Sequence, residues 1–174
     1  MQRHVSYWLM PTAADRAFFE DLIETLAHTH QAPIFVPHVT IYSGESPVDE
    51  DPLEIIAQST LGVQEIRLRV DRVLYTEAFT KTLFVQFHPS DLLSRMTESM
   101  RRLSAWPSAY RLDPHLSLLY KHMGMQDKQH LATTIQLPMS EVSFDAVWAN
   151  ASAGGTRTAE DVERWEIVCR KGLL

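Results

Sequence analysis

Two short segments of the chain place a histidine two positions before a hydroxyl residue. Residues 36–41 are Val-Pro-His-Val-Thr-Ile, and residues 113–118 are Asp-Pro-His-Leu-Ser-Leu. Side chains at positions i and i+2 of a strand point to the same face, so His38 would project together with Thr40. By the same rule, His115 would project together with Ser117. If the two strands meet, two imidazoles and two hydroxyls line one groove.

Such a set of side chains suits in-line attack on a phosphodiester. One imidazole would take a proton from water while the other gives a proton to the departing oxygen, and help of this kind contributes about 10²–10⁴-fold to the rate. An unperturbed histidine pKa of about 6.5 allows either role at neutral pH. The hydroxyls can donate hydrogen bonds to the non-bridging oxygens as negative charge builds. This chemistry needs no metal and no cofactor, and we expect neither.

The bare pattern is common in this sequence. Four of the eight histidines precede a serine or threonine by two positions, because His4 and His88 also match. Only His38 and His115 follow a proline and continue into an aliphatic residue after the hydroxyl. Ser90, which completes the His88 match, is better explained as a helix N-cap. The alternative for the two proline-preceded histidines is a strand residue with an ordinary hydrogen bond, and spacing alone leaves that alternative open.

The period of the apolar residues predicts alternating strands and helices. The expected strands cover residues 5–10, 34–42, 66–75, 83–87, 115–120, 142–149 and 165–170. The expected helices cover residues 13–28, 52–59, 90–103 and 126–135. A shift of apolar parity in the third strand predicts a β-bulge near Asp71. The order of strands and helices is close to an internal repeat of one unit, with one histidine motif in each half.

Short connections favour antiparallel sheets with helices packed on one face, so we expect an α+β fold. Two similar sheets would leave a groove between them. No linker or low-complexity stretch divides the chain, so residues 1–174 are expected to form a single domain.

The composition narrows the range of partners. The chain has 174 residues, 45% of them apolar, and a formal net charge of −6. That charge argues against a protein that wraps long nucleic acid but allows a small anion in a locally basic cleft. No apolar run approaches the ~20 residues needed to cross a bilayer, so no membrane partner is expected. Cys169 is the single cysteine, so no internal disulfide can form and a reducing cytoplasm is expected. We also expect a monomer.

The chain resembles a known family over nearly its whole length. The segments FVPHVTIYSG and DPHLSLLY resemble the two catalytic strands of the 2H phosphoesterase superfamily, most closely of its plant-type cyclic phosphodiesterase branch. VSYWLMP resembles the opening strand of that branch, DRVLYTEAFTKTLFVQF its central hairpin, and RWEIVCRKGL its last strand. The resemblance implies a bilobal fold, with two pseudo-symmetric antiparallel sheets, outer helices and a central cleft within residues 1–174.

The resemblance also implies an activity and its residues. The activity is hydrolysis of small cyclic phosphodiesters, such as ADP-ribose 1″,2″-cyclic phosphate and nucleoside 2′,3′-cyclic phosphates, the latter to 2′-phosphates. His38 and His115 would be the acid–base pair, and Thr40 and Ser117 would hold the phosphate. We expect His115 to activate water and His38 to protonate the leaving oxygen. Tyr120 matches the tyrosine that ends the second catalytic strand in the family, and it reaches the phosphate only if the strand ends before it.

Two further aromatic residues are candidates for the wall of the cleft. Phe84 shares a strand face with Gln86 and His88, and it can offer a stacking platform to a base, a contact worth about 1–3 kcal/mol. Trp8 shares a face with Ser6 and can line the rim. Ordinary burial is the alternative for both aromatic side chains.

Two other functions stay open at this stage. One is a ligase or phosphodiesterase acting on 2′,5′ linkages of RNA, as in other branches of the superfamily, although the net charge and the short connections disfavour an RNA-spanning surface. The other is a nucleotide-binding module without turnover. Binding alone does not need an acid–base pair, so the presence of both histidines argues against such a module.

Overall fold

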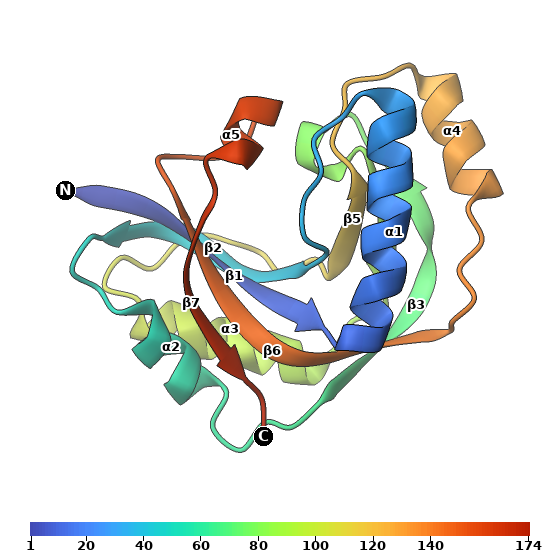
Figure 1. Ribbon diagram of the computed structural model, residues 1–174. Helices are drawn as coiled ribbons and strands as arrows, with labels where there is room; N and C mark the ends of the chain where they lie inside the picture. Colours follow the sequence, from blue (N-terminus) through green and yellow to red (C-terminus); the bar gives the residue numbers. More distant parts are fainter.

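A seven-stranded antiparallel sheet lies at the centre of the computed structural model, which describes residues 1–174 (Figure 1). The strands are β1 (Gln2–Pro11), β2 (Val39–Pro47), β3 (Ile66–Tyr75), β4 (Leu83–Phe87), β5 (His115–Leu119), β6 (Glu141–Ser152) and β7 (Glu166–Gly172). The helices are α1 (Ala13–His30), α2 (Pro52–Ser59), α3 (Asp91–Leu103), α4 (Met125–Thr134) and α5 (Ala159–Glu163), with one 3-10 turn, η1 (Phe79–Lys81). The predicted alternation of strands and helices is confirmed. Only the short α5 and η1 lie where no element was expected.

The strand order is β1-β2-β5-β4-β3-β6-β7, and a further pairing between β6 and β1 closes six strands into a ring. One half of the ring consists of β1, β2 and β6, with β7 added along β6. The other half consists of β3, β4 and β5. The halves are joined where β2 meets β5 and where β3 meets β6. The two expected sheets are therefore the two halves of one continuous sheet, and each half carries one histidine motif.

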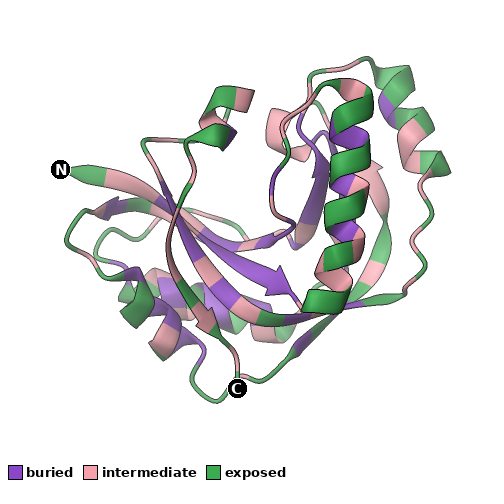
Figure 2. Ribbon diagram, in the orientation of Figure 1, coloured by how far each residue is buried: buried purple, intermediate pink, exposed green.

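Each half of the sheet has its own pair of helices. α2 and α3 pack together against β2, β6 and β7, whereas α1 packs on β5 and α4 on β3 (Figure 1). Figure 2 shows the buried residues along the strands and the inner helix faces, with exposed residues facing outward. None of the helices combines the length and apolar character that a bilayer crossing requires. The predicted α+β fold with outer helices is confirmed.

One cluster of 25 buried apolar side chains runs through both halves. Leu9 of β1, Phe87 of β4, Leu116 of β5 and Phe144 of β6 all belong to it. Full burial of such a side chain contributes about 1.5–3 kcal/mol to folding. The shared core holds the two halves in a fixed relation, and this relation positions the two histidine motifs.

Two local features follow the sequence closely. Ser90 caps α3, because its side-chain oxygen accepts a hydrogen bond from the backbone N–H of Leu93 at 3.3 Å. The pairing of β3 with β4 shifts register between Val70 and Arg72. This irregularity lies at Asp71, where the change of apolar parity predicts a bulge.

The strands that carry the motifs are shorter than predicted. β2 begins at Val39 and not at residue 34, because Pro33 and Pro37 lack the N–H groups that a strand ladder needs. β5 ends one residue before Tyr120. The chain next to both motifs is therefore irregular, and strict strand alternation does not apply there.

Candidate active site

Both histidine motifs open onto one cleft between the two halves of the sheet. β2 and β5 lie side by side, with Val39 paired to Leu116 in antiparallel register. Both of these side chains are buried in the core, so their neighbours along each strand point the opposite way. The four motif residues that were predicted to converge all line the cleft: His38, Thr40, His115 and Ser117.

Each histidine ring is held by the backbone two residues before it. His38 Nδ1 donates a hydrogen bond to the carbonyl oxygen of Val36 at 2.7 Å, and His115 Nδ1 donates to the carbonyl oxygen of Asp113 at 2.7 Å. A carbonyl only accepts, so Nδ1 carries the proton and Nε2 is the nitrogen left for the cleft. The proline between carbonyl and histidine restricts the preceding residue to extended conformations, which fixes the direction of that carbonyl.

Burial lowers the pKa of both histidines, because the imidazolium loses hydration. His38 is 7% exposed, and its pKa falls to about 4; the bond to the Val36 carbonyl opposes this shift, and the charge of His115 adds to it. The His115 side chain is 21% exposed. Burial also lowers the pKa of His115, with the backbone bond to Asp113 opposing the shift and the charge of Lys81 adding to it. Both rings are therefore neutral at pH 7, and each Nε2 can accept a proton.

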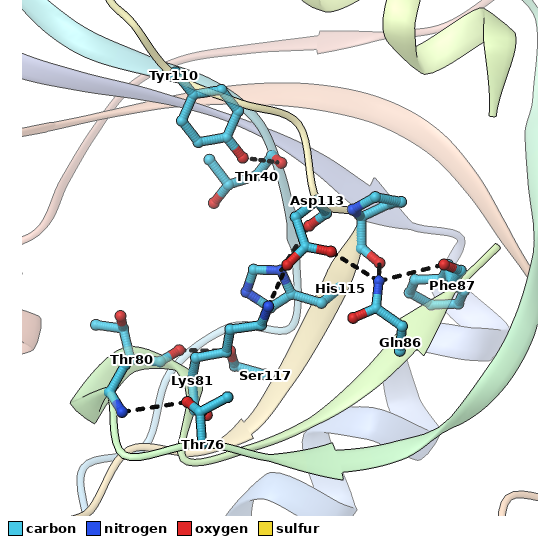
Figure 3. A network of polar contacts seen from close by, with 12 residues as sticks. Thr40, Thr76, Thr80, Lys81, Gln86, Phe87, Tyr110, Asp113, His115 and Ser117 are labelled. Carbon is cyan, nitrogen blue, oxygen red and sulfur yellow. Dashed lines mark hydrogen bonds and ion pairs between the residues drawn. The ribbon is translucent and has the colours of Figure 1, made fainter. Parts of the chain in front are cut away.

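An ion pair lies beside His115 (Figure 3). The ammonium of Lys81 bonds one carboxylate oxygen of Asp113, and Gln86 Nε2 donates to the other at 2.9 Å. Burial raises the pKa of Asp113, but the hydrogen bonds from Lys81 and Gln86 outweigh it and leave the pKa lowered. The carboxylate therefore stays ionised, with one oxygen 4.0 Å from His115 Nδ1.

The two motif hydroxyls differ in their contacts. The Ser117 hydroxyl donates to the carbonyl oxygen of Thr80 at 2.7 Å. The Thr40 hydroxyl forms no hydrogen bond within the protein, while its backbone carbonyl accepts one from the Tyr110 hydroxyl at 2.9 Å. Figure 3 shows Thr40, His115 and Ser117 facing a common space. The Thr40 hydroxyl is free to donate to an anion there, whereas the Ser117 hydroxyl must first leave Thr80.

Aromatic rings form the wall around His38. Trp8 stacks on the imidazole, with ring centroids 3.9 Å apart and an interplanar angle of 15°. Trp165 meets the same imidazole edge-on at 5.8 Å. Tyr120 stacks on Phe35 at 3.9 Å and lines the cleft, which it reaches because β5 ends before it. Trp8 lines the cleft but is only 2% exposed, so it forms part of the buried wall and not of the rim. The contacts with Trp8 and Trp165 explain why His38 is nearly excluded from solvent.

Phe84 requires a correction. It lies on the strand face that was predicted, with its ring 5.4 Å from the His115 ring in an edge-on arrangement. However, Phe84 is only 2% exposed and does not line the cleft. The ammonium of Lys81, carried by η1, lies 4.5 Å from its ring centroid. Phe84 therefore packs against the His115 ring within the protein and offers no open face on which a base can stack.

The cleft encloses about 280 Å³. None of its lining residues is a lysine, arginine, aspartate or glutamate. Several lining residues, mostly from loops, η1 and β6, were not evident from the sequence: Thr80, Tyr110, Asn150, Ser152, Thr156 and Trp165. No group of three or more histidine, cysteine, aspartate or glutamate side chains is placed to hold a metal ion. The arrangement can therefore offer an anion two imidazoles, several neutral donors and aromatic walls.

Residues 1–173 match the family described as "Cyclic phosphodiesterase-like protein". The chain belongs to this cyclic phosphodiesterase-like family. Within similar proteins, a cyclic phosphodiesterase of Arabidopsis thaliana is 26% identical over 168 residues, which cover 94% of this chain and 91% of that protein. A 2′,3′-cyclic-nucleotide 3′-phosphodiesterase of Phaeosphaeria nodorum is 23% identical over 190 residues, covering 97% of this chain and 98% of that protein.

A solved structure shares the fold of this cyclic phosphodiesterase-like protein. E. coli LigT, in its complex with 3′-AMP, has a TM-score of 0.60 at 15% identity, and the match covers 99% of each chain. At this level of identity the likeness shows the fold. The predictions of the 2H phosphoesterase superfamily and of a phosphodiesterase are confirmed.

Proposed function

We propose that this protein hydrolyses cyclic phosphodiesters of ribose by metal-independent catalysis with two histidines. The candidate substrates are nucleoside 2′,3′-cyclic phosphates and ADP-ribose 1″,2″-cyclic phosphate. The observation that carries the proposal is the placement of His38 and His115 on one cleft, each bonded through Nδ1 to a carbonyl so that Nε2 remains available. The names of the Arabidopsis and Phaeosphaeria relatives support cyclic phosphates as the substrate class.

The proposed reaction is a single in-line displacement at phosphorus. One Nε2 takes a proton from water as the water oxygen bonds to phosphorus, and the bond from phosphorus to the opposite ring oxygen breaks. The other imidazole, protonated beforehand, gives its proton to that departing oxygen. For a nucleoside 2′,3′-cyclic phosphate the departing atom would be O3′, which leaves a 2′-phosphate. The name of the Phaeosphaeria relative, a 3′-phosphodiesterase, supports this direction.

The surroundings of the two rings favour the reverse of the roles expected from the sequence. His38, with its pKa lowered to about 4, is the ring that stays neutral most firmly and suits the base. His115 is more exposed than His38, so its imidazolium keeps more hydration, takes up a proton more readily and suits the acid, although the charge of Lys81 lowers its pKa more than the Asp113 carboxylate raises it. A bound phosphate anion would raise the pKa of both rings and help His115 to charge.

The phosphate itself would meet uncharged donors. The Thr40 hydroxyl is unbonded within the protein, and the Ser117 hydroxyl can turn from the Thr80 carbonyl toward a non-bridging oxygen. The Tyr120 hydroxyl is a third candidate donor, and burial raises its pKa, so it keeps its proton. These donors would stabilise charge on the phosphoryl oxygens as water attacks.

Turnover assays with EDTA present test the proposal directly. The purified protein is incubated with adenosine 2′,3′-cyclic phosphate, ADP-ribose 1″,2″-cyclic phosphate and a 2′,5′-linked dinucleotide, and products are separated by chromatography. Opening of a cyclic phosphate to the 2′-phosphate or 1″-phosphate is the expected result. Cleavage confined to the 2′,5′ linkage would replace the proposal by an RNA-directed activity. Tight binding without any product would indicate a binding module.

A further inference from the structure

A row of neutral polar side chains crosses three strands beside the catalytic residues. In the paired strands, Ser6 of β1 lies opposite Asn150 of β6 on one side and opposite Ser43 of β2 on the other. All three side chains line the cleft. The row lies two residues along β1 from Trp8, which stacks on His38. At about 3.3 Å per strand residue, the row is roughly 7 Å along the strands from this stack.

Hydrogen bonds link the row to His4. His4 Nδ1 donates to a carboxylate oxygen of Glu45 at 3.2 Å, and its Nε2 lies 2.7 Å from the Ser43 hydroxyl. The Ser43 and Ser6 hydroxyls are hydrogen-bonded to each other at 2.8 Å. A hydroxyl oxygen has two lone pairs, so Ser6 can accept from a donor in the cleft whichever way this bond points.

Asn150 adds a second acceptor next to Ser6. The residue is 3% exposed, and its Oδ1 has no hydrogen-bond partner in the protein. A buried amide oxygen without a partner is uncommon, because losing hydration without a new hydrogen bond destabilises the fold. A ligand that fills the cleft can supply the missing donor. Because Oδ1 itself is buried, the Asn150 side chain has to turn toward the cleft, where Oδ1 and Ser6 Oγ would bind neighbouring O–H or N–H groups of that ligand.

The charge of the cleft limits which ligand this is. The only groups that can become cationic along its wall are histidines, and no lysine or arginine lines it. The Asn150 amide oxygen only accepts, so it attracts a sugar hydroxyl or a base N–H and not a phosphate, whereas the serine hydroxyls can donate or accept. Arg157 and Arg164 line a neighbouring hollow, which shares Ser152, Gly154 and Gly155 with the cleft.

We propose that the Asn150–Ser6–Ser43 row binds the uncharged nucleoside part of the substrate, so that the cleft selects mononucleoside 2′,3′-cyclic phosphates over pyrophosphate-bridged ones. The proposal rests on the cyclic phosphodiesterase function above. A row about 7 Å from the catalytic stack suits the sugar hydroxyl or base edge of one nucleoside whose cyclic phosphate lies between the two histidines.

The test compares substrates with and without a nucleoside. kcat/KM is measured for adenosine and uridine 2′,3′-cyclic phosphates and for glycerol 1,2-cyclic phosphate, which has no base and no furanose. Asn150→Ala should lower the ratio of the nucleoside value to the glycerol value about 5- to 10-fold, as expected for the loss of one hydrogen bond. Ser6→Ala should lower the same ratio, which keeps the test valid if the Asn150 variant folds poorly.

Ser59→Ala is the matched control. Ser59 lies in α2, and its hydroxyl is also buried and without a partner, but it does not line the cleft. This variant should leave the ratio unchanged. An equal loss on all three substrates in the Asn150 and Ser6 variants, or no loss on any, would overturn the proposal.

ADP-ribose 1″,2″-cyclic phosphate tests the alternative, a pyrophosphate-bridged substrate. The proposal expects a lower kcat/KM for it than for adenosine 2′,3′-cyclic phosphate, and little change on Arg157→Ala combined with Arg164→Ala. A preference for the ADP-ribose compound that the double arginine variant abolishes would show that the cleft takes a pyrophosphate-bridged substrate.

Calorimetry separates the failure of this inference from the failure of the proposed function. Adenosine 2′-phosphate and inorganic phosphate are titrated into the wild-type protein and the Asn150→Ala variant without any turnover. If the variant binds the nucleotide more weakly but phosphate equally well, the row binds the nucleoside, even if no cyclic phosphate is hydrolysed. Equal binding of the nucleotide by both proteins would show that the row does not bind the nucleoside, even if hydrolysis is observed.

Discussion

Val39 of β2 pairs with Leu116 of β5, and this is the only residue pair in register between the two strands. Continued by one position on either side, the antiparallel register places His38 across from Ser117 and Thr40 across from His115. All four side chains line the same cleft. A phosphate that contacts one motif is therefore expected to reach the other.

The first prediction concerns the two imidazoles. His38→Gln and His115→Gln should each lower kcat for a nucleoside 2′,3′-cyclic phosphate by about 10²-fold or more, because each removes one proton-transfer group. Steady-state kinetics measure the effect, and circular dichroism checks that both variants fold. His88→Gln is the matched control, since His88 also precedes a serine by two positions but does not line the cleft. A wild-type rate in either cleft variant would contradict the acid–base roles.

The second prediction concerns pH. The active form needs one neutral and one protonated imidazole, and the pKa of both rings is lowered in the free protein, that of His38 to about 4. As pH falls below about 4, the base becomes protonated and kcat/KM should fall. As pH rises through the pKa of His115, which lies below about 6.5, the acid loses its proton and kcat/KM should fall again. The profile should therefore peak on the acidic side of pH 6.5, and a plateau extending to pH 8 would contradict this electrostatic account.

The sequence was sufficient to predict the two strands that carry the histidine motifs, because the pattern that marks each strand is local. A duplicated proline-histidine-hydroxyl pattern specifies the tautomer, the direction of each ring and the shared face within six residues. The same holds for the bulge near Asp71 and for the Ser90 cap. The start of β2 was misplaced because Pro33 and Pro37 remove the backbone donors in a segment that otherwise looks like a strand.

Contacts between distant parts of the chain were not predictable in this way. Lys81 of η1 covers Phe84 and also binds Asp113, 32 residues further along. Strand alternation placed Phe84 on the right face but carried no information on what covers it. Asn150 is likewise placed next to Ser6 only by the pairing of β6 with β1 that closes the ring.

The third prediction concerns the ion pair beside His115. Lys81 lowers the pKa of His115 and the Asp113 carboxylate raises it. Lys81→Met should therefore raise the pKa of His115, and Asp113→Asn should lower it further while keeping the backbone carbonyl that holds the ring. Titration of the His115 ring protons by NMR measures both shifts. Because the variants remove charges of opposite sign at one place, shifts in the same direction would show that repacking, and not charge, controls this pKa.

The fourth prediction separates the acid from the base. A substrate analogue in which sulfur replaces O3′ of the 2′,3′-cyclic phosphate has a leaving group that departs without a proton. If His115 is the acid, His115→Gln should lose about 10²-fold or more on the oxygen substrate but only a few-fold on the sulfur analogue. His38→Gln should lose the same factor on both, because the base acts on water in each case. Rescue of the His38 variant by sulfur, with none for the His115 variant, would restore the roles expected from the sequence.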